Sequence, residues 1–225
     1  MTEQTAYHHG NLREELVAAA LEMIQESGGA YGVTLRKIAS RVGVSHAAPY
    51  RHFQDKKDLL AAVARQGFDL LMDWTRKRLS ETDGEPLSRF GAWGMAYMDF
   101  AIAHPAHFRV MFAPPEKGMT LSEDLRPESS QYFKEFQDLV SDCHDKGVLV
   151  GEDPASITRA AWSMVHGFST LFIGNHMETT GLDFQAVTHM KRSILTTFYR
   201  GTRPDGEGLP YRRTAGKKES EKENP

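Results

Sequence analysis

A short stretch of the chain concentrates positive charge. Between residues 34 and 57, six basic side chains stand against one acidic residue, Asp55, a balance of +5. Because the 225-residue chain has a formal net charge of −3, the remainder carries −8. A basic block in an otherwise acidic protein favours local contact with a polyanion, since Lys and Arg neutralise phosphate charge. Taken alone, such a charge run could also be a solvated helix face.

The same stretch has the residue spacing of two short helices joined by a tight turn. Thr34 can cap a helix over residues 35–42, and Gly43 supplies a turn position that is open to positive φ. Ala39 is small enough for two helices to cross closely, and Val44 is an apolar plug in the turn. We therefore expect a helix-turn-helix.

The second helix of this pair contains a proline, which limits where it can begin. We expect it to end near Phe53, with Ser45 or His46 as its cap. If Ser45 caps the helix, Pro49 removes an early hydrogen bond. If His46 caps it, Pro49 falls in the first turn, where no N–H is missed. We place the start at His46.

This second helix would present small and polar side chains outward. Its size and chemistry suit the major groove of duplex DNA, where arginine can bind guanine and a small side chain can touch a thymine methyl group. For reading bases, Arg36, His46 and Ala47 are the candidates. The residues that we expect to project outward are Ser45, His46, Ala47, Tyr50 and Arg51.

The rest of the chain consists of apolar residues at three- and four-residue spacing, which indicates helices. No alternating strand pattern of useful length occurs, so the expected fold class is all-α. We divide the chain into a three-helix N-terminal domain (1–55), a helical bundle (56–200) and a disordered tail (201–225) rich in Gly, Pro, Lys and Glu. The expected elements of the bundle are a long helix from Lys56 to about Leu79, a helix from Pro86, a short one over 105–112, a loop over 113–127, one helix ending at Gly147, and two last helices over 154–177 and 183–200.

Residues 34–53, followed by Gln54–Leu60, closely resemble the DNA-binding domain of TetR-family transcriptional regulators. The resemblance runs from about Leu12 to Leu60, with the turn glycine and Lys56 in register. It implies that Lys56 binds phosphate, that Tyr50 and His52 approach the DNA backbone, and that Thr34 and Arg36 form a further contact pair. Tyr50 could equally pack as core with one solvated end. The complete expected DNA-binding set is Thr34, Arg36, Ser45, His46, Ala47, Tyr50, Arg51, His52 and Lys56.

A second resemblance lies in the C-terminal half. Trp162-Ser-Met-Val-His-Gly167 looks like the signature of the WHG-type ligand-binding domain of one TetR subgroup, and Tyr7–Arg13 is similar to that subgroup's N-terminus. His8, His9 and Arg13 are candidates for an arm that touches DNA, or for a disordered chain end. Gly167 suggests close approach of a neighbouring helix.

The resemblance implies a small-molecule effector and a homodimer. The two last helices, 154–177 and 183–200, are apolar over more than one stripe, as expected if one face meets a partner; the alternative is that they lie centrally in the bundle. An aromatic stripe is core more often than pocket, and a buried His166 is more often structural than a ligand contact. The candidate ligand-binding residues are Trp93, Tyr97, Phe100, Phe108, Phe112, Phe133, Phe136, Met164, His166 and Phe168.

The preferred function is therefore a ligand-responsive regulator, most often a repressor, that binds a palindromic operator on double-stranded DNA as a dimer and is released by a small apolar or aromatic effector. A helical-bundle enzyme is disfavoured, because the chain has no Glu-x-x-His pair, no His-Glu-x-x-His and no Gly-x-Ser-x-Gly. We expect no metal, no cofactor and no membrane span, and a cytoplasmic location. A partner-binding helical protein without a ligand stays open.

Overall fold

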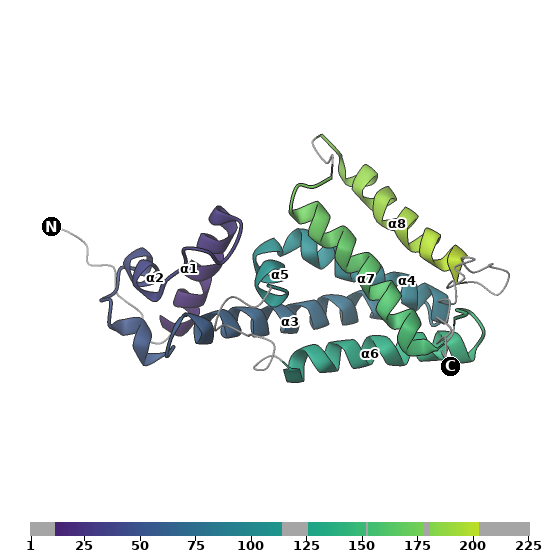
Figure 1. Ribbon diagram of the computed structural model, residues 1–225, viewed down its shortest axis with the longest axis horizontal. Coiled ribbons are helices and arrows are strands. Elements are labelled where there is room, and N and C mark those ends of the chain that lie inside the picture. Colours follow the sequence, from purple (N-terminus) through teal and green to yellow (C-terminus); the bar gives the residue numbers. More distant parts are fainter. Residues whose placement is uncertain (1–11, 114–125, 152, 178–180, 203–225) are drawn as a thin grey trace, which may run out of the picture.

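The computed structural model describes residues 12–113, 126–151, 153–177 and 181–202 of the chain. These residues form helices and no strand, which confirms the all-α prediction (Figure 1). In chain order the elements are α1 (Leu12–Ser27), α2 (Leu35–Val42), the 3₁₀ helix η1 (Ala48–Arg51), α3 (Lys56–Ser80), α4 (Pro86–Ala103), α5 (Pro105–Met111), α6 (Arg126–Asp145), α7 (Pro154–Ile173) and α8 (Phe184–Gly201).

Local sequence signals set the ends of α2. The Thr34 side chain accepts a hydrogen bond from the backbone N–H of Lys37 at 3.2 Å, so Thr34 is the predicted N-cap. Gly43 ends the helix at φ 80°, a left-handed conformation that costs glycine little. The backbone N–H of Val44 then donates to Ala39 at 2.9 Å and closes the turn. The first helix of the pair and its turn are as predicted.

The predicted second α-helix, from His46 to Phe53, is wrong. The structure has only the four-residue 3₁₀ helix η1, which begins after Ala47, and no side chain caps it. Pro49 lies in its first turn but has no N–H to donate back to Ser45, whose carbonyl instead accepts from Ala48 at 2.9 Å. Pro49 thus excludes an α-helix capped by Ser45. A helix capped by His46 would need no N–H from Pro49, yet the segment forms a tight turn in which the Ser45 carbonyl is bonded in the 3₁₀ pattern.

Helix α3 extends from the N-terminal unit into the bundle (Figure 1). The Asp55 carboxylate caps its start by accepting from the backbone N–H of Asp58 at 2.9 Å. Its N-terminal half packs against α1, and along its length it packs against α4, α5 and α6. The predicted long helix is confirmed, and it belongs to both halves of the molecule.

The helices of the bundle begin at proline or aspartate and largely match their predicted spans. Pro86 and Pro105 start α4 and α5, and Asp153 and Asp183 cap α7 and α8. Two predicted bounds are wrong. The expected loop 113–127 ends earlier, because α6 begins at Arg126, and the helix expected over 154–177 stops at Ile173, just before Gly174.

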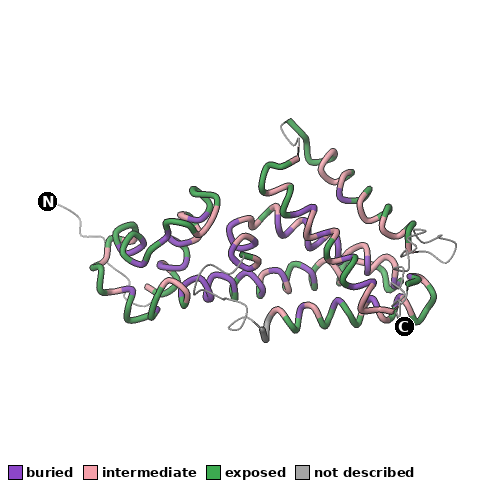
Figure 2. Tube along the Cα trace, viewed as in Figure 1, coloured by how far each residue is buried: buried purple, intermediate pink, exposed green. Residues whose placement is uncertain are grey.

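One apolar core joins the two halves (Figure 2). At the N-terminal end, Leu16 and Ile24 of α1 and Ile38 of α2 are fully buried. The same cluster continues through Val63 of α3 to Val165 of α7. Because the core is continuous along α3, a displacement in the bundle can be transmitted to the helix-turn-helix by packing alone.

Some predictions concern residues outside the described ranges. They are the arm residues His8 and His9 and the tail beyond residue 202. Arg13, the third arm candidate, belongs to α1 instead, and its guanidinium lies 5.2 Å from the centre of the Phe53 ring.

Candidate nucleic-acid interface and ligand crevice

The predicted DNA-binding residues lie around the helix-turn-helix, and most of them face solvent. Tyr50 is 55% exposed, so more than half of this residue is accessible to a partner. Beneath the surface, Pro49 and Phe53 are buried and anchor the turn to the core. Lys56 is half-buried and has an interaction partner of its own. The exposed members of the set are Thr34, Arg36, Ser45, His46, Ala47, Tyr50, Arg51 and His52.

Internal hydrogen bonds restrict several of these side chains. The Thr34 hydroxyl caps α2, so one of its lone pairs is occupied. The Nε2 of His46 lies 3.1 Å from the Oγ of Ser40, which leaves Nδ1 as the ring nitrogen free to reach a base. Among the described residues no carboxylate pairs with Arg36 or Arg51. These two guanidinium groups are therefore available to a polyanion.

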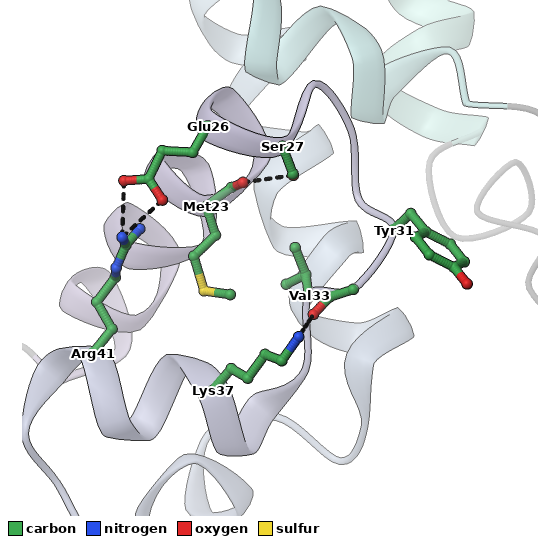
Figure 3. A pocket seen from close by; sticks show the side chains of 8 residues that line it. Met23, Glu26, Ser27, Tyr31, Val33, Lys37 and Arg41 are labelled. Carbon is green, nitrogen blue, oxygen red and sulfur yellow. Dashed lines mark hydrogen bonds and ion pairs between the residues drawn. The ribbon is translucent and has the colours of Figure 1, made fainter.

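Other cations of the basic block are used within the N-terminal unit. A groove of about 460 Å³ between α1 and α2 contains two of them (Figure 3). The Arg41 guanidinium donates to both carboxylate oxygens of Glu26 at 2.8 Å, and the Lys37 ammonium donates to the carbonyl of Gly32 at 2.9 Å. Because Glu26 neutralises Arg41, the charge balance of +5 overstates the charge that this surface offers to DNA. Neither Lys37 nor Arg41 was among the predicted contacts.

Most of the predicted ligand-binding residues pack against one another instead of lining a void. Trp93 stacks on Phe136 with ring centres 3.7 Å apart, and Tyr97 meets Phe108 edge to face at 5.7 Å. Trp93, Tyr97, Phe100, Phe108, Phe136 and Phe168 are buried. Phe112, Phe133, Met164 and His166 are half-buried. The aromatic stripe of the bundle is therefore mainly core.

A polar pair lies inside this aromatic core. The Tyr97 hydroxyl and the Nδ1 of His166 are 2.8 Å apart. Burial raises the pKa of Tyr97 and lowers that of His166, so both groups are neutral near pH 7. The two groups share one hydrogen bond, and when the hydroxyl donates to Nδ1 the imidazole proton resides on Nε2. In that tautomer, Nε2–H of His166 is a hydrogen-bond donor for which the described residues offer no acceptor.

Three of the predicted ligand-binding residues, Phe108, Phe112 and His166, do line a cavity of about 460 Å³, which we call the crevice. It lies between the loop that joins α1 to α2 and the helices α5 and α7, and its volume is in the usual range for small-molecule sites. The sequence analysis missed the other lining residues, among them Tyr31 and Arg109. An isolated arginine in a short helix gave no periodic signal that could have identified it.

Gly167, in contrast, does not mark a close helix approach within the chain. No described atom outside its local backbone lies within 4 Å of the place that a Cβ would occupy. The close approaches occur at Gly67, where a Cβ would lie 2.6 Å from the Sδ of Met111, and at Gly94, where it would lie 2.6 Å from Cδ2 of Leu195. These glycines let α3 approach α5 and let α4 approach α8.

The bundle also contains an ion triad that the sequence analysis missed. The Asp99 carboxylate of α4 accepts from Arg78 of α3 at 2.5 Å and from Lys191 of α8. Lys191 is only 3% exposed and is the buried residue of α8. The triad therefore ties α8 to the end of α3 and to α4.

Within the described residues, no group of three His, Cys, Asp or Glu side chains is arranged to hold a metal ion. None of the helices there combines the length and apolar composition that a membrane span requires.

An all-α fold with an exposed helix-turn-helix and a separate helical bundle defines a DNA-binding transcriptional regulator. Two family models match the chain: "Bacterial regulatory proteins, tetR family" over residues 16–63, and "Tetracyclin repressor-like, C-terminal domain" over residues 90–193. Together they cover more than half of the sequence. The chain belongs to the TetR family of bacterial transcriptional regulators.

The chain is also similar to individual proteins of known sequence or structure. The nucleoid occlusion factor SlmA of Vibrio cholerae is 30% identical over 127 residues, which are 56% of this chain and 63% of that protein. A structure of a protein with unknown function from Rhodococcus sp. RHA1 is 30% identical, with a TM-score of 0.71 over 88% of this chain and 99% of that one. The fatty acid degradation regulator FadR of Bacillus halodurans shares the fold at 16% identity, with a TM-score of 0.69 over 86% of this chain and 97% of its own.

Proposed function

We propose that the protein is a ligand-responsive repressor that binds a palindromic operator as a homodimer. The observation that carries the proposal is the exposed surface of the helix-turn-helix, where eight of the nine predicted contact residues face solvent over the buried Pro49 and Phe53. The functional division lies near residue 55, with α3 serving both the DNA-binding unit and the bundle.

The roles of the contact residues follow from their chemistry. Phosphate contacts supply affinity and position the protein, and contacts to base edges supply specificity. Lys56 begins α3, where backbone N–H groups also attract anions, so it is the leading phosphate contact, assisted by Tyr50 and His52. His46, Ala47 and Arg36 read bases.

A dimer is required because a single short reading element binds weakly, and two half-sites one DNA turn apart need a twofold-related pair. The expected interface helices, 154–177 and 183–200, correspond to α7 and α8. Both expose apolar side chains: Leu171 is 47% exposed and Phe184 81%. The open space around Gly167 also gives a partner helix room to approach.

Two observations bear on whether the bundle senses a ligand. The packed aromatic interior favours a helical protein without an effector, whereas the crevice of about 460 Å³ favours a sensor. We choose the sensor, because the crevice joins the bundle to the loop between α1 and α2. In this proposal the protein is cytoplasmic, is not an enzyme, and carries a WHG-type C-terminal domain with Trp162, His166 and Gly167 as its signature.

The DNA-binding roles are tested by selecting binding sites from random duplex DNA and titrating the selected sites at several salt concentrations. A dimer predicts a palindromic site and a steep fall of affinity with salt. Lys56→Ala should weaken binding to all sequences alike and lower the salt slope by about 1, while His46→Ala should change which sequences are preferred. Lys134→Ala, on the exposed side of α6, is the matched control. If neither Lys56→Ala nor His46→Ala alters binding, the assigned surface is wrong.

The dimer is tested by sedimentation velocity. Leu171→Asp should produce monomers and abolish binding to the palindromic site. Val150→Asp places the same charge at an apolar position of similar exposure, 44%, outside α7 and α8, and should leave the dimer intact. A dimer that survives Leu171→Asp unchanged contradicts an interface centred on this face of α7.

A further inference from the structure

The crevice combines an apolar wall with hydrogen-bond donors. Phe108 and Phe112 of α5 form the wall, and Tyr31, which is 89% exposed, lies at the rim on the loop between α1 and α2. Figure 3 shows the Tyr31 side chain pointing away from the neighbouring groove of the N-terminal unit. An aromatic ring left in water beside an aromatic wall is placed to cover an apolar ligand.

The charge of the crevice is one-sided. Arg109 of α5 contributes a permanent positive charge, and none of the described residues that line the crevice is an aspartate or glutamate. One Arg109 N–H donates to the carbonyl of Ile173 at 2.7 Å, which satisfies the end of α7. A guanidinium group has five N–H donors, so others stay available to a ligand. An unbalanced charge beside apolar surface favours an anion.

His166 adds a neutral donor on the opposite helix. Its Nδ1 is hydrogen-bonded to the Tyr97 hydroxyl, so Nε2 is the ring nitrogen that can reach a ligand. In the tautomer in which the hydroxyl is the donor, Nε2 carries the proton and donates to a ligand oxygen. Arg109 on α5 and His166 on α7 thus both line the same crevice as donors. A carboxylate accepts from both kinds of group, and its pairing with arginine adds geometric specificity.

Two other cavities of similar size lack these properties. One, of about 430 Å³ between α1 and α3, is lined by the carboxylates of Glu14 and Asp69. The other is the groove between α1 and α2. In the groove between α1 and α2, Arg41 and Lys37 are already satisfied by Glu26 and by a backbone carbonyl. That groove also lies wholly within the N-terminal unit, so a ligand there would not contact the bundle.

From these observations we propose that the crevice binds an apolar carboxylic acid, with its carboxylate on Arg109 and His166 and its apolar body against Phe108 and Phe112. This inference rests on the proposed function and specifies its effector by chemical class. The ligand would touch the loop between α1 and α2 directly, so its binding would act on the helix-turn-helix without first passing through the packed aromatic core.

The test uses three acids, each with its neutral amide: benzoate and benzamide, 2-naphthoate and 2-naphthamide, and octanoate and octanamide. Titration calorimetry of the full-length protein should show at least one acid binding roughly tenfold or more tightly than its amide, as expected for a charge-assisted hydrogen bond. Arg109→Gln should abolish this preference. Arg159→Gln removes an equal charge from an exposed site outside the crevice and should preserve it.

A second variant separates loss of binding from loss of folding, because Arg109 also caps α7. Thr170 is exposed on α7 and lines the crevice, so Thr170→Trp should fill the site, keep Arg109 in place and abolish acid binding without lowering the melting temperature. If no acid binds better than its amide, or if the preference survives both variants, the inference is wrong.

Titrations with the selected operator distinguish this inference from the proposed function. A protein that binds its palindrome but discriminates no acid from its amide overturns the ligand class and leaves the regulator intact. A protein that binds acids through Arg109 but binds no DNA overturns the regulator and leaves the crevice assignment intact. When both hold, the acids that bind should also release the operator.

Discussion

The ion triad makes a strong prediction about stability. Asp99→Ala removes the one carboxylate that faces the Lys191 ammonium, which is 3% exposed, and leaves a positive charge inside the protein. Breaking a buried pair from one side typically costs about 3–5 kcal/mol. Lys191→Met should cost far less, within about 1 kcal/mol, because Asp99 keeps Arg78 as its partner and the apolar side chain fits the buried space.

Urea unfolding followed by circular dichroism at fixed protein concentration measures both changes in the free energy of unfolding. Asp138→Ala is the control, since Asp138 forms an exposed pair with Lys134 at 2.8 Å, and such pairs are worth less than about 0.5 kcal/mol. The reasoning is refuted if Asp99→Ala costs no more than Asp138→Ala. It is also refuted if Lys191→Met costs as much as Asp99→Ala, because burial of an unpaired charge would then not be the cause.

Three further outcomes are expected. Gly67→Ala should destabilise the fold by about 1–3 kcal/mol, because its Cβ would overlap Met111. Gly91→Ala, in open space on α4, should instead stabilise the fold by about 0.5–1 kcal/mol. Equal effects of the two substitutions in urea unfolding would contradict the close approach at Gly67. Burial lowers the pKa of His107 to about 4, so the unfolded state binds the proton at a higher pH than the folded state. The free energy of unfolding should therefore fall by up to about 3 kcal/mol as the pH drops from above 6.5 to 4. His107→Gln should flatten this part of the pH profile. Burial raises the pKa of the Cys143 thiol to about 11, so a disulfide reagent at pH 8 should label this thiol only as fast as the protein opens. Labelling at the rate of a free thiol would refute its burial.

The parts of the fold that were predictable depend on neighbours in sequence. Thr34 and Gly43 fix the ends of α2 by a hydrogen bond and a backbone conformation that involve only nearby residues. The same reasoning failed for the second reading element. There we assumed that an α-helix would continue to Phe53 with Pro49 in its first turn. The structure has only the four-residue 3₁₀ helix η1, which ends at Arg51, two residues after the proline.

The parts that were not predictable depend on tertiary contacts. The partners Asp99 and Lys191 are 92 residues apart, and no spacing rule relates them. The crevice is formed by a loop and two helices from different parts of the chain, so Arg109 could not be assigned to it before the helices were in place. Nine of the ten candidate ligand-binding residues are aromatic, a chemistry that suits both a core and a pocket. Only packing distances, such as 3.7 Å between Trp93 and Phe136, distinguish the two.

The position of the crevice bears on how a ligand could control DNA binding. Helix α5 packs against both α1 and α3, and its contact with α3 is tight at Gly67. A ligand in the crevice would therefore lie against the loop after α1 and against α5, which contacts both α1 and α3. A ligand can shift the spacing of the two reading elements only by binding one arrangement better than the other. A coupling free energy of about 1–3 kcal/mol would change operator affinity by roughly 5- to 150-fold. Because Arg109 connects α5 to the last turn of α7, a ligand bound to its guanidinium would act on the contact between the proposed dimer interface and the DNA-binding unit. The carboxylate of the proposed ligand would thus bind where the bundle meets the DNA-binding unit. We therefore expect a charged effector to change operator affinity more than an apolar molecule of the same shape.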